Sequence, residues 1–195
     1  MPQTNEAAVT KTDKLLWAVC LPAIPASVSP NHVTLFRFIL TPFVLYLLYV
    51  GQWLPALILF ALAAFSDAVD GALARTRNQI TDWGKVYDPI ADKLLVGLSA
   101  IVIIPVYFDF LLVFLLILTE IMIILGAYWI RYYTPHSELQ ANIWGKVKMF
   151  IQSVSLTLLI LAGLVAMPSV VIDLIEIALY TSLMLAVISA VYAGL

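Results

Sequence analysis

Long apolar runs follow one another along most of the chain and restrict the folds that it can adopt. Hydrophobic residues make up 63% of the 195 residues and charged residues only 11%, whereas a soluble domain is about 45–50% apolar. Because a helix needs about 20 apolar residues to cross a bilayer, the sequence predicts an all-α integral membrane protein with six transmembrane helices. Their expected bounds are 32–50, 53–75, 86–106, 110–132, 144–166 and 170–193.

The first 30 residues differ in composition from the rest. Residues 1–14 are polar and mixed in charge, and the apolar run after them contains Pro22, Pro25 and Pro30. That run is too short and too rich in proline to cross a bilayer, so we expect a short helix in the membrane interface. No cleavable signal peptide is expected. The predicted division is a cytoplasmic or interfacial segment over 1–30 and a six-helix membrane domain over 31–195.

The basic residues indicate how the chain is oriented in the membrane. With six spans and a cytoplasmic N-terminus, all ten Lys and Arg residues fall on one side, and the opposite loops carry none. Basic residues are enriched in cytoplasmic loops, so both termini and the polar loops 76–85 and 133–143 are expected in the cytoplasm. We therefore predict a multi-pass protein of a bacterial inner or cell membrane with its active site on the cytoplasmic side.

Charge and cysteine content exclude several classes of function. The formal net charge of −2 is too small to imply nucleic acid or another charged polymer as a partner. The single cysteine, Cys20, excludes an internal disulfide and a zinc site built from cysteines.

Four aspartates gather where the second and third expected helices meet. Asp67 and Asp70 are three residues apart and Asp88 and Asp92 are four apart, so each pair lies on one helix face. The loop between the helices returns the chain as an antiparallel neighbour, and the two faces can meet. Carboxylates gathered at a membrane boundary are costly and indicate function. Their oxygen atoms suit Mg²⁺ or Mn²⁺, and two ions could share the set and bind substrate phosphates.

A plainer explanation is that aspartates at helix ends are caps or solvated termini, which is the role expected of Asp82. The number of aspartates and the residues between them favour a metal site instead. Gly71 and Ala74 leave room for a ligand against the backbone. Arg75 carries a planar fork that pairs with phosphate oxygens.

The complete pattern is Asp67-x2-Asp70-Gly71-x2-Ala74-Arg75-x8-Gly84-x3-Asp88-x3-Asp92. It resembles the signature of the CDP-alcohol phosphotransferases, membrane enzymes of phospholipid synthesis, and the likeness extends to the six-helix layout. The resemblance implies transfer of a phosphatidyl group from CDP-diacylglycerol to an alcohol, with release of CMP. It also implies a homodimer embedded in membrane lipid.

The resemblance assigns a part to each residue of the pattern. Asp67, Asp70 and Asp88 would bind metal, while Asp92 would take the proton of the acceptor hydroxyl and also contact metal. The residues expected to line the CDP site are Asp70, Gly71, Ala74, Arg75, Gly84 and Thr34. For Thr34, capping of the first helix is an equal alternative.

Different segments favour different acceptor alcohols. Similarity to the phosphatidylglycerophosphate synthase branch, which uses glycerol 3-phosphate, lies in NHVTLFR (31–37), DPIADKLLV (88–96) and WGKVKMFIQ (144–152). In contrast, AYWIRYYT (127–134) resembles the cardiolipin synthase type, which uses phosphatidylglycerol. Glycerol 3-phosphate is the leading prediction, and phosphatidylglycerol or an inositol phosphate stays open.

An acidic acceptor needs basic side chains, and the candidates are Arg37, Lys93, Lys146 and Arg131. Arg37 lies about two turns into the first helix, where it could anchor an acidic ligand, pair with an aspartate or snorkel to the interface. The other three could instead be ordinary cytoplasmic charge near lipid headgroups. Glu120, near the middle of the fourth helix, is expected to face the bundle as a structural or a catalytic group.

Two other functions use carboxylates in a membrane. An intramembrane prenyltransferase should carry two separated aspartate-rich motifs and more than six helices. A cation transporter would place its ion ligands near the middle of the bilayer, often on interrupted helices. The aspartates of this chain lie at one rim beside Arg75, which favours the transferase.

Overall fold

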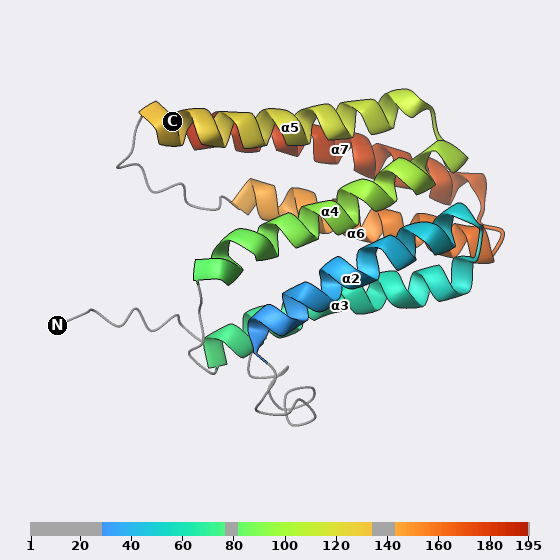
Figure 1. Cartoon of the computed structure of the whole chain (residues 1–195). Helices are drawn as coiled ribbons and strands as arrows, with labels where there is room; N and C mark the ends of the chain where they lie inside the picture. The colour runs from blue at the N-terminus through green and yellow to red at the C-terminus, as the bar shows by residue number, and fades with distance from the viewer. Residues whose placement is uncertain (1–28, 77–81, 134–142, 195) are drawn as a thin grey trace. The chain divides into compact units, whose positions relative to one another are not determined.

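The computed structural model describes residues 29–76, 82–133 and 143–194, which form the expected helices (Figure 1). They are α2 (Pro30–Tyr49), α3 (Trp53–Thr76), α4 (Asp82–Tyr107), α5 (Phe110–Tyr133), α6 (Ile143–Leu164) and α7 (Ser169–Gly194). The all-α class is confirmed, and every predicted bound agrees with the observed one to within four residues. The interfacial helix predicted within 1–30 lies outside the described residues.

Two helices begin two or more residues earlier than predicted. Ser29 and His32 form the cap of α2: the His32 N–H donates to the Ser29 carbonyl at 3.0 Å, and the Ser29 N–H donates to His32 Nδ1 at 3.2 Å. Pro30 is the first helical residue, where its missing N–H has no cost. α4 begins at Asp82, about one turn early, because aspartate is favoured at a helix N-terminus.

The faces of α2 are arranged in the opposite way to those of a soluble helix. Thr34 and Arg37 are fully buried, whereas Phe36, Ile39 and Phe43 are about half exposed. A helix of a soluble protein buries its apolar face and exposes its polar one. The reversed arrangement is stable where the surroundings are apolar, as in the hydrocarbon core of a bilayer.

Length and hydropathy identify candidate spans among the described residues. α2, α4, α6 and α7 each contain a stretch long and apolar enough to cross a membrane. The described apolar stretches of α3 and α5 are shorter, over Trp53–Ser66 and Phe110–Gly126. The membrane character of the chain is confirmed, and the crossing of the bilayer by all six helices stays a prediction.

The chain forms two compact units, residues 1–46 with 58–95 and residues 47–57 with 96–195. In the first unit, the described parts of α2, α3 and α4 bury small and polar side chains together with larger apolar ones such as Phe60 and Leu95. In the second unit, α7 packs against both α5 and α6 (Figure 1). Its core includes Leu112, Val113, Leu116, Leu156, Leu159, Ile160, Ile175, Leu179 and Leu183.

A glycine in the second unit allows an aromatic ring to approach the backbone of α6. A β-carbon built at Gly163 would overlap the indole ring of Trp53. Trp53 is the first residue of α3, so the absence of a side chain at Gly163 allows the start of α3 to pack on the end of α6.

A buried ion pair joins two helices of the second unit. The Lys148 ammonium on α6 contacts Glu120 Oε2 on α5, and the Lys148 side chain is only 3% exposed. Gln152 and Ser155 continue the same buried face of α6. Because a charge in an apolar environment is costly unless it is paired, this contact gives Glu120 a structural role in holding α5 to α6.

We expect Lys148→Met to lower the free energy of unfolding by about 3 kcal/mol, because it removes the cation that offsets the Glu120 carboxylate. The double variant with Glu120→Leu should recover most of that loss, since neither buried charge is left. Thermal unfolding in detergent micelles measures both effects. Lys146→Met, which changes an exposed side chain two residues earlier, is the control. A double variant less stable than Lys148→Met would contradict this account.

Candidate metal site

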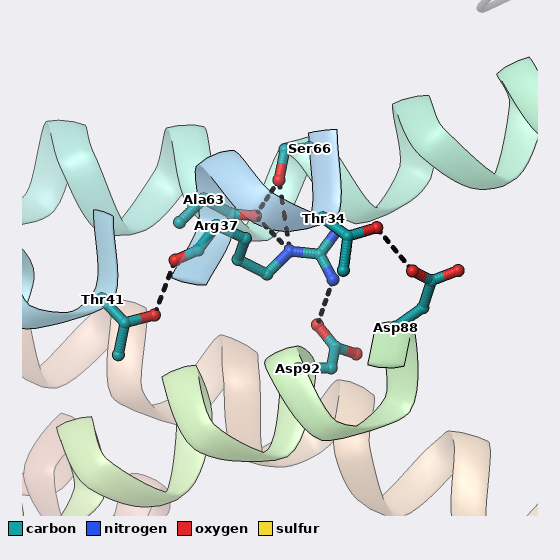
Figure 2. Close-up of polar contacts among 7 residues, drawn as sticks. All are labelled: Thr34, Arg37, Thr41, Ala63, Ser66, Asp88 and Asp92. Carbon is teal, nitrogen blue, oxygen red and sulfur yellow. Dashed lines mark hydrogen bonds and ion pairs between the residues drawn. The ribbon is translucent and has the colours of Figure 1, made fainter. Parts of the chain in front are cut away.

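Two buried polar residues of α2 contact Asp88 and Asp92 of α4 (Figure 2). The Thr34 hydroxyl donates to Asp88 Oδ1 at 2.5 Å. The Arg37 Nη1 atom lies 3.6 Å from Asp92 Oδ1. Thr34 and Arg37 are three residues apart, and Asp88 and Asp92 are four apart, so one turn of α2 faces one turn of α4. These contacts fix the register of the two helices at the predicted site.

Arg37 also contacts α3. Its Nε–H is shared between the Ala63 carbonyl at 3.3 Å and Ser66 Oγ at 3.2 Å. The Ser66 hydroxyl in turn donates to the Ala63 carbonyl at 2.7 Å. A guanidinium carries five N–H donors in a rigid plane, and here its Nε faces α3 while Nη1 faces Asp92 on α4 (Figure 2).

Small side chains on α3 make this contact possible. Ala63 is fully buried and Ser66 nearly so, between the larger Phe60 and Val69. Small residues allow membrane helices to approach each other closely, and here they let the Arg37 side chain reach the backbone of α3. The sequence spacing of these buried residues follows the helical period, which places them on one face of α3.

The structure brings together two of the four predicted metal ligands. Asp88 and Asp92 lie on one face of α4, and both side chains are half-buried. Asp67 directly follows Ser66 in the helical backbone of α3 and Asp70 comes three residues later, but the side chains of both aspartates are outside the described part of the chain. A cage of four carboxylates therefore stays a prediction.

Two of the described residues are of the type that binds a hard divalent cation, although the described part of the chain holds no group of three such side chains. Asp88 and Asp92 supply carboxylate oxygens, which are the ligands that Mg²⁺ and Mn²⁺ prefer. Thr34 and Arg37 each hold one of these carboxylates by a hydrogen bond or an ion pair, as partners of metal ligands commonly do. Half-burial of both carboxylates limits competition from water while leaving access for a ligand.

The residues predicted to line a nucleotide site are less fully described. Gly71, Ala74 and Arg75 continue α3, and Gly84 lies in the first turn of α4, while the side chains of Ala74 and Arg75 are outside the described residues. Thr34 donates its hydroxyl to Asp88, and the cap of α2 is formed by other residues. The nucleotide site stays a prediction.

The four basic residues predicted for the acceptor have different environments. Arg37 is fully buried and pairs with an aspartate, one of the three roles considered for it. Lys93 is partly exposed on α4, and Lys146 is exposed on α6. The side chain of Arg131 lies outside the described residues. Acceptor binding by these residues stays a prediction.

Sequence reasoning did not single out Ser66, which ends an apolar run and directly precedes Asp67. The available signal was a small polar residue on the same helical face as Ala63, opposite a basic residue in the preceding helix. Such a signal is weak, because the partner Arg37 is 29 positions away.

Comparison with known proteins gives a family and a set of relatives. A family model for CDP-alcohol phosphatidyltransferase matches residues 27–191. Proteins named CDP-diacylglycerol–glycerol-3-phosphate 3-phosphatidyltransferase from Shigella flexneri and Escherichia coli K12 are each 34% identical over 157 residues, covering 77% of this chain and 84% of theirs. The Rickettsia typhi protein of the same name is 34% identical over 141 residues, covering 69% and 76%.

We expect Thr34→Val to weaken Mn²⁺ binding about 10-fold, the usual effect of losing a residue that orients a metal ligand. Valine keeps the shape of threonine and removes only the hydroxyl that donates to Asp88. Electron paramagnetic resonance of unbound Mn²⁺ during titration of the purified protein measures the affinity. Thr41→Val is the matched control, since the Thr41 hydroxyl donates to a carbonyl of its own helix. Equal affinities in the two variants would contradict the assignment of Asp88 as a ligand oriented by Thr34.

Proposed function

Because the chain belongs to the CDP-alcohol phosphatidyltransferase family, we propose that it transfers the phosphatidyl group of CDP-diacylglycerol to glycerol 3-phosphate. The products are phosphatidylglycerophosphate and CMP. The observation that carries this proposal is the 34% identity, over most of the chain, to relatives named for that reaction. The contacts of Thr34 with Asp88 and of Arg37 with Asp92 support it.

The transfer exchanges one phosphorus–oxygen bond for another. The acceptor hydroxyl oxygen forms a bond to the phosphorus of the phosphatidyl group, and the bond from that phosphorus to the CMP oxygen breaks. CMP leaves with the electron pair of the broken bond, and the hydroxyl proton passes to Asp92. The buried Arg37 beside Asp92 holds the carboxylate that accepts this proton in a fixed position.

Enzymes of this family generally depend on a divalent metal. The proposed ligands are Asp67, Asp70, Asp88 and Asp92, holding two ions of Mg²⁺ or Mn²⁺. When bound, the metal neutralises the diphosphate and stabilises the charge that develops on the leaving CMP. On the nucleotide side we propose Gly71, Ala74, Arg75 and Gly84, next to Asp70 and Thr34.

The setting proposed for this reaction is the cytoplasmic face of a bacterial membrane. It is supported by the ten basic residues that fall on one side when six spans are assumed. For the acceptor phosphate we propose Lys93, Lys146 and Arg131. Assembly as a homodimer is proposed from family likeness alone.

An assay with one alcohol at a time identifies the acceptor. We expect purified protein with CDP-diacylglycerol and Mg²⁺ to release CMP when glycerol 3-phosphate is added, because its phosphate suits a basic pocket. Reactions with EDTA, or without any alcohol, are the controls. CMP release driven by phosphatidylglycerol instead would assign the cardiolipin synthase type. Uptake of a labelled cation into vesicles without CMP release would contradict the proposal and favour a transporter.

A substitution at Asp92 separates proton removal from nucleotide binding. We expect Asp92→Asn to lower kcat by about 10²- to 10⁴-fold, the usual effect of removing a general base, because the amide cannot accept the hydroxyl proton. CDP binding, measured by calorimetry, should be largely kept. Asp109→Asn, at an exposed position between α4 and α5, is the control. Lost CDP binding with unchanged kcat would contradict the role of Asp92.

A further inference from the structure

We propose that Arg37 is a positioning residue that assembles the metal site before any metal binds. Its guanidinium clamps the end of α3 that bears Asp67 and Asp70 to the end of α4 that bears Asp88 and Asp92. The inference rests on the metal-binding part of the proposed function and is independent of which alcohol is the acceptor.

The contacts of Arg37 are divided between the two aspartate-bearing helices. On α3, Nε–H donates to the Ala63 carbonyl and to Ser66 Oγ, at 3.3 and 3.2 Å. On α4, Nη1 lies 3.6 Å from Asp92 Oδ1. Ser66 directly precedes Asp67 in the chain. A single rigid plane therefore joins the turn of α3 before the first aspartate to the last aspartate on α4 (Figure 2).

The burial of Arg37 makes this a fixed contact. Its exposed fraction is 0%, and a charge in an apolar environment is costly unless it stays with its partners. Moving the guanidinium toward a substrate would break its contacts with both helices at once. Lys146, in contrast, has an exposed side chain that can meet a substrate without such losses. Burial thus favours positioning over acceptor binding for Arg37.

A clamp of this kind opposes the repulsion between the carboxylates of a metal site before any metal is bound. Gathered carboxylates repel one another and, without a cation, tend to drive their helices apart. A guanidinium between α3 and α4 supplies one positive charge and also sets the spacing of the helices, through hydrogen bonds to α3 and an ion pair to Asp92 on α4. Thr34 adds a second fixed contact, from α2 to Asp88. The free energy needed to bring the metal ligands into position is then supplied when the protein folds, so it does not reduce the affinity for the metal.

Variants of Arg37 separate three possible roles of the guanidinium, with Mn²⁺ affinity measured by electron paramagnetic resonance. Lysine keeps the charge but lacks the planar fork that spans both helices. A clamp therefore predicts that Arg37→Lys and Arg37→Gln both weaken Mn²⁺ binding by about 10- to 100-fold. Wild-type affinity in Arg37→Lys would show that charge alone suffices. Tighter binding in Arg37→Gln would show that the guanidinium competes with the metal. Either result overturns the clamp.

If the Arg37 variants do not fold, a milder substitution at Ser66 tests the clamp in their place. Ser66→Ala keeps the guanidinium and its charge and removes one acceptor on α3. We expect it to weaken Mn²⁺ binding about fivefold, the effect of one hydrogen bond. Unchanged affinity overturns the clamp. Thr41→Val, buried one turn after Arg37 on α2 and bonded within that helix, is the matched control and should bind Mn²⁺ as the wild type does.

A distance measurement tests preassembly without using activity. Spin labels on cysteines placed at Leu62 of α3 and Leu94 of α4, both exposed, in a Cys20→Ser background, report the separation of the helices by pulsed electron resonance. In otherwise wild-type protein the distribution of distances between the labels should be the same in EDTA as in Mg²⁺. In the Arg37→Gln variant this distribution should be broad in EDTA and become narrow when Mg²⁺ is added. If the distribution also becomes narrow on adding Mg²⁺ to the protein that keeps Arg37, preassembly is overturned.

These outcomes are distinguishable from failure of the proposed function. If the wild type binds Mn²⁺ but releases no CMP with any alcohol, the proposed reaction is wrong, and the affinities of the variants still decide the clamp. If the wild type releases CMP and the Arg37 variants bind Mn²⁺ as it does, the clamp is overturned and the reaction stands.

Discussion

A guanidinium buried among three helices is the interaction on which the first unit depends. The side chain of Arg37 extends from α2 and contacts α3 at the Ala63 carbonyl and Ser66, and α4 at Asp92. In water such contacts would each contribute little, because water competes for every donor and acceptor. In an apolar environment water does not compete for the contacts of the same cation. Its contacts therefore decide how the helices that bear the aspartates are placed.

The second unit also contains a buried basic side chain that pairs with a carboxylate of a neighbouring helix. Lys148 on α6 is buried against Glu120 on α5, while the outward faces of the helices are apolar. Burying a basic side chain against a carboxylate leaves no net charge in the apolar interior, and the pair specifies which helix faces meet. An apolar exterior with charges paired inside is the arrangement that a bilayer requires.

The sequence was sufficient to predict the elements but not the contacts between them. Apolar runs set the bounds of the helices closely, and the misses at Pro30 and Asp82 arise from capping, which extends a helix beyond its apolar stretch. The periodic spacing of Asp88 and Asp92 placed them correctly on one face. The partners of Thr34 and Lys148 are 54 and 28 positions away, and no local pattern specifies such pairs. Ser66 was missed for the same reason.

The central claim is that the carboxylates of α3 and α4 together form one cage for divalent ions, which binds the diphosphate of the lipid donor. A structure of the protein with Mn²⁺ and CDP, measured at the manganese absorption edge, tests it most directly. The account predicts anomalous peaks within ligand distance of Asp67, Asp70, Asp88 and Asp92, with the CDP diphosphate in contact with the ions. Peaks away from these carboxylates, or aspartates of α3 directed away from those of α4, would contradict it.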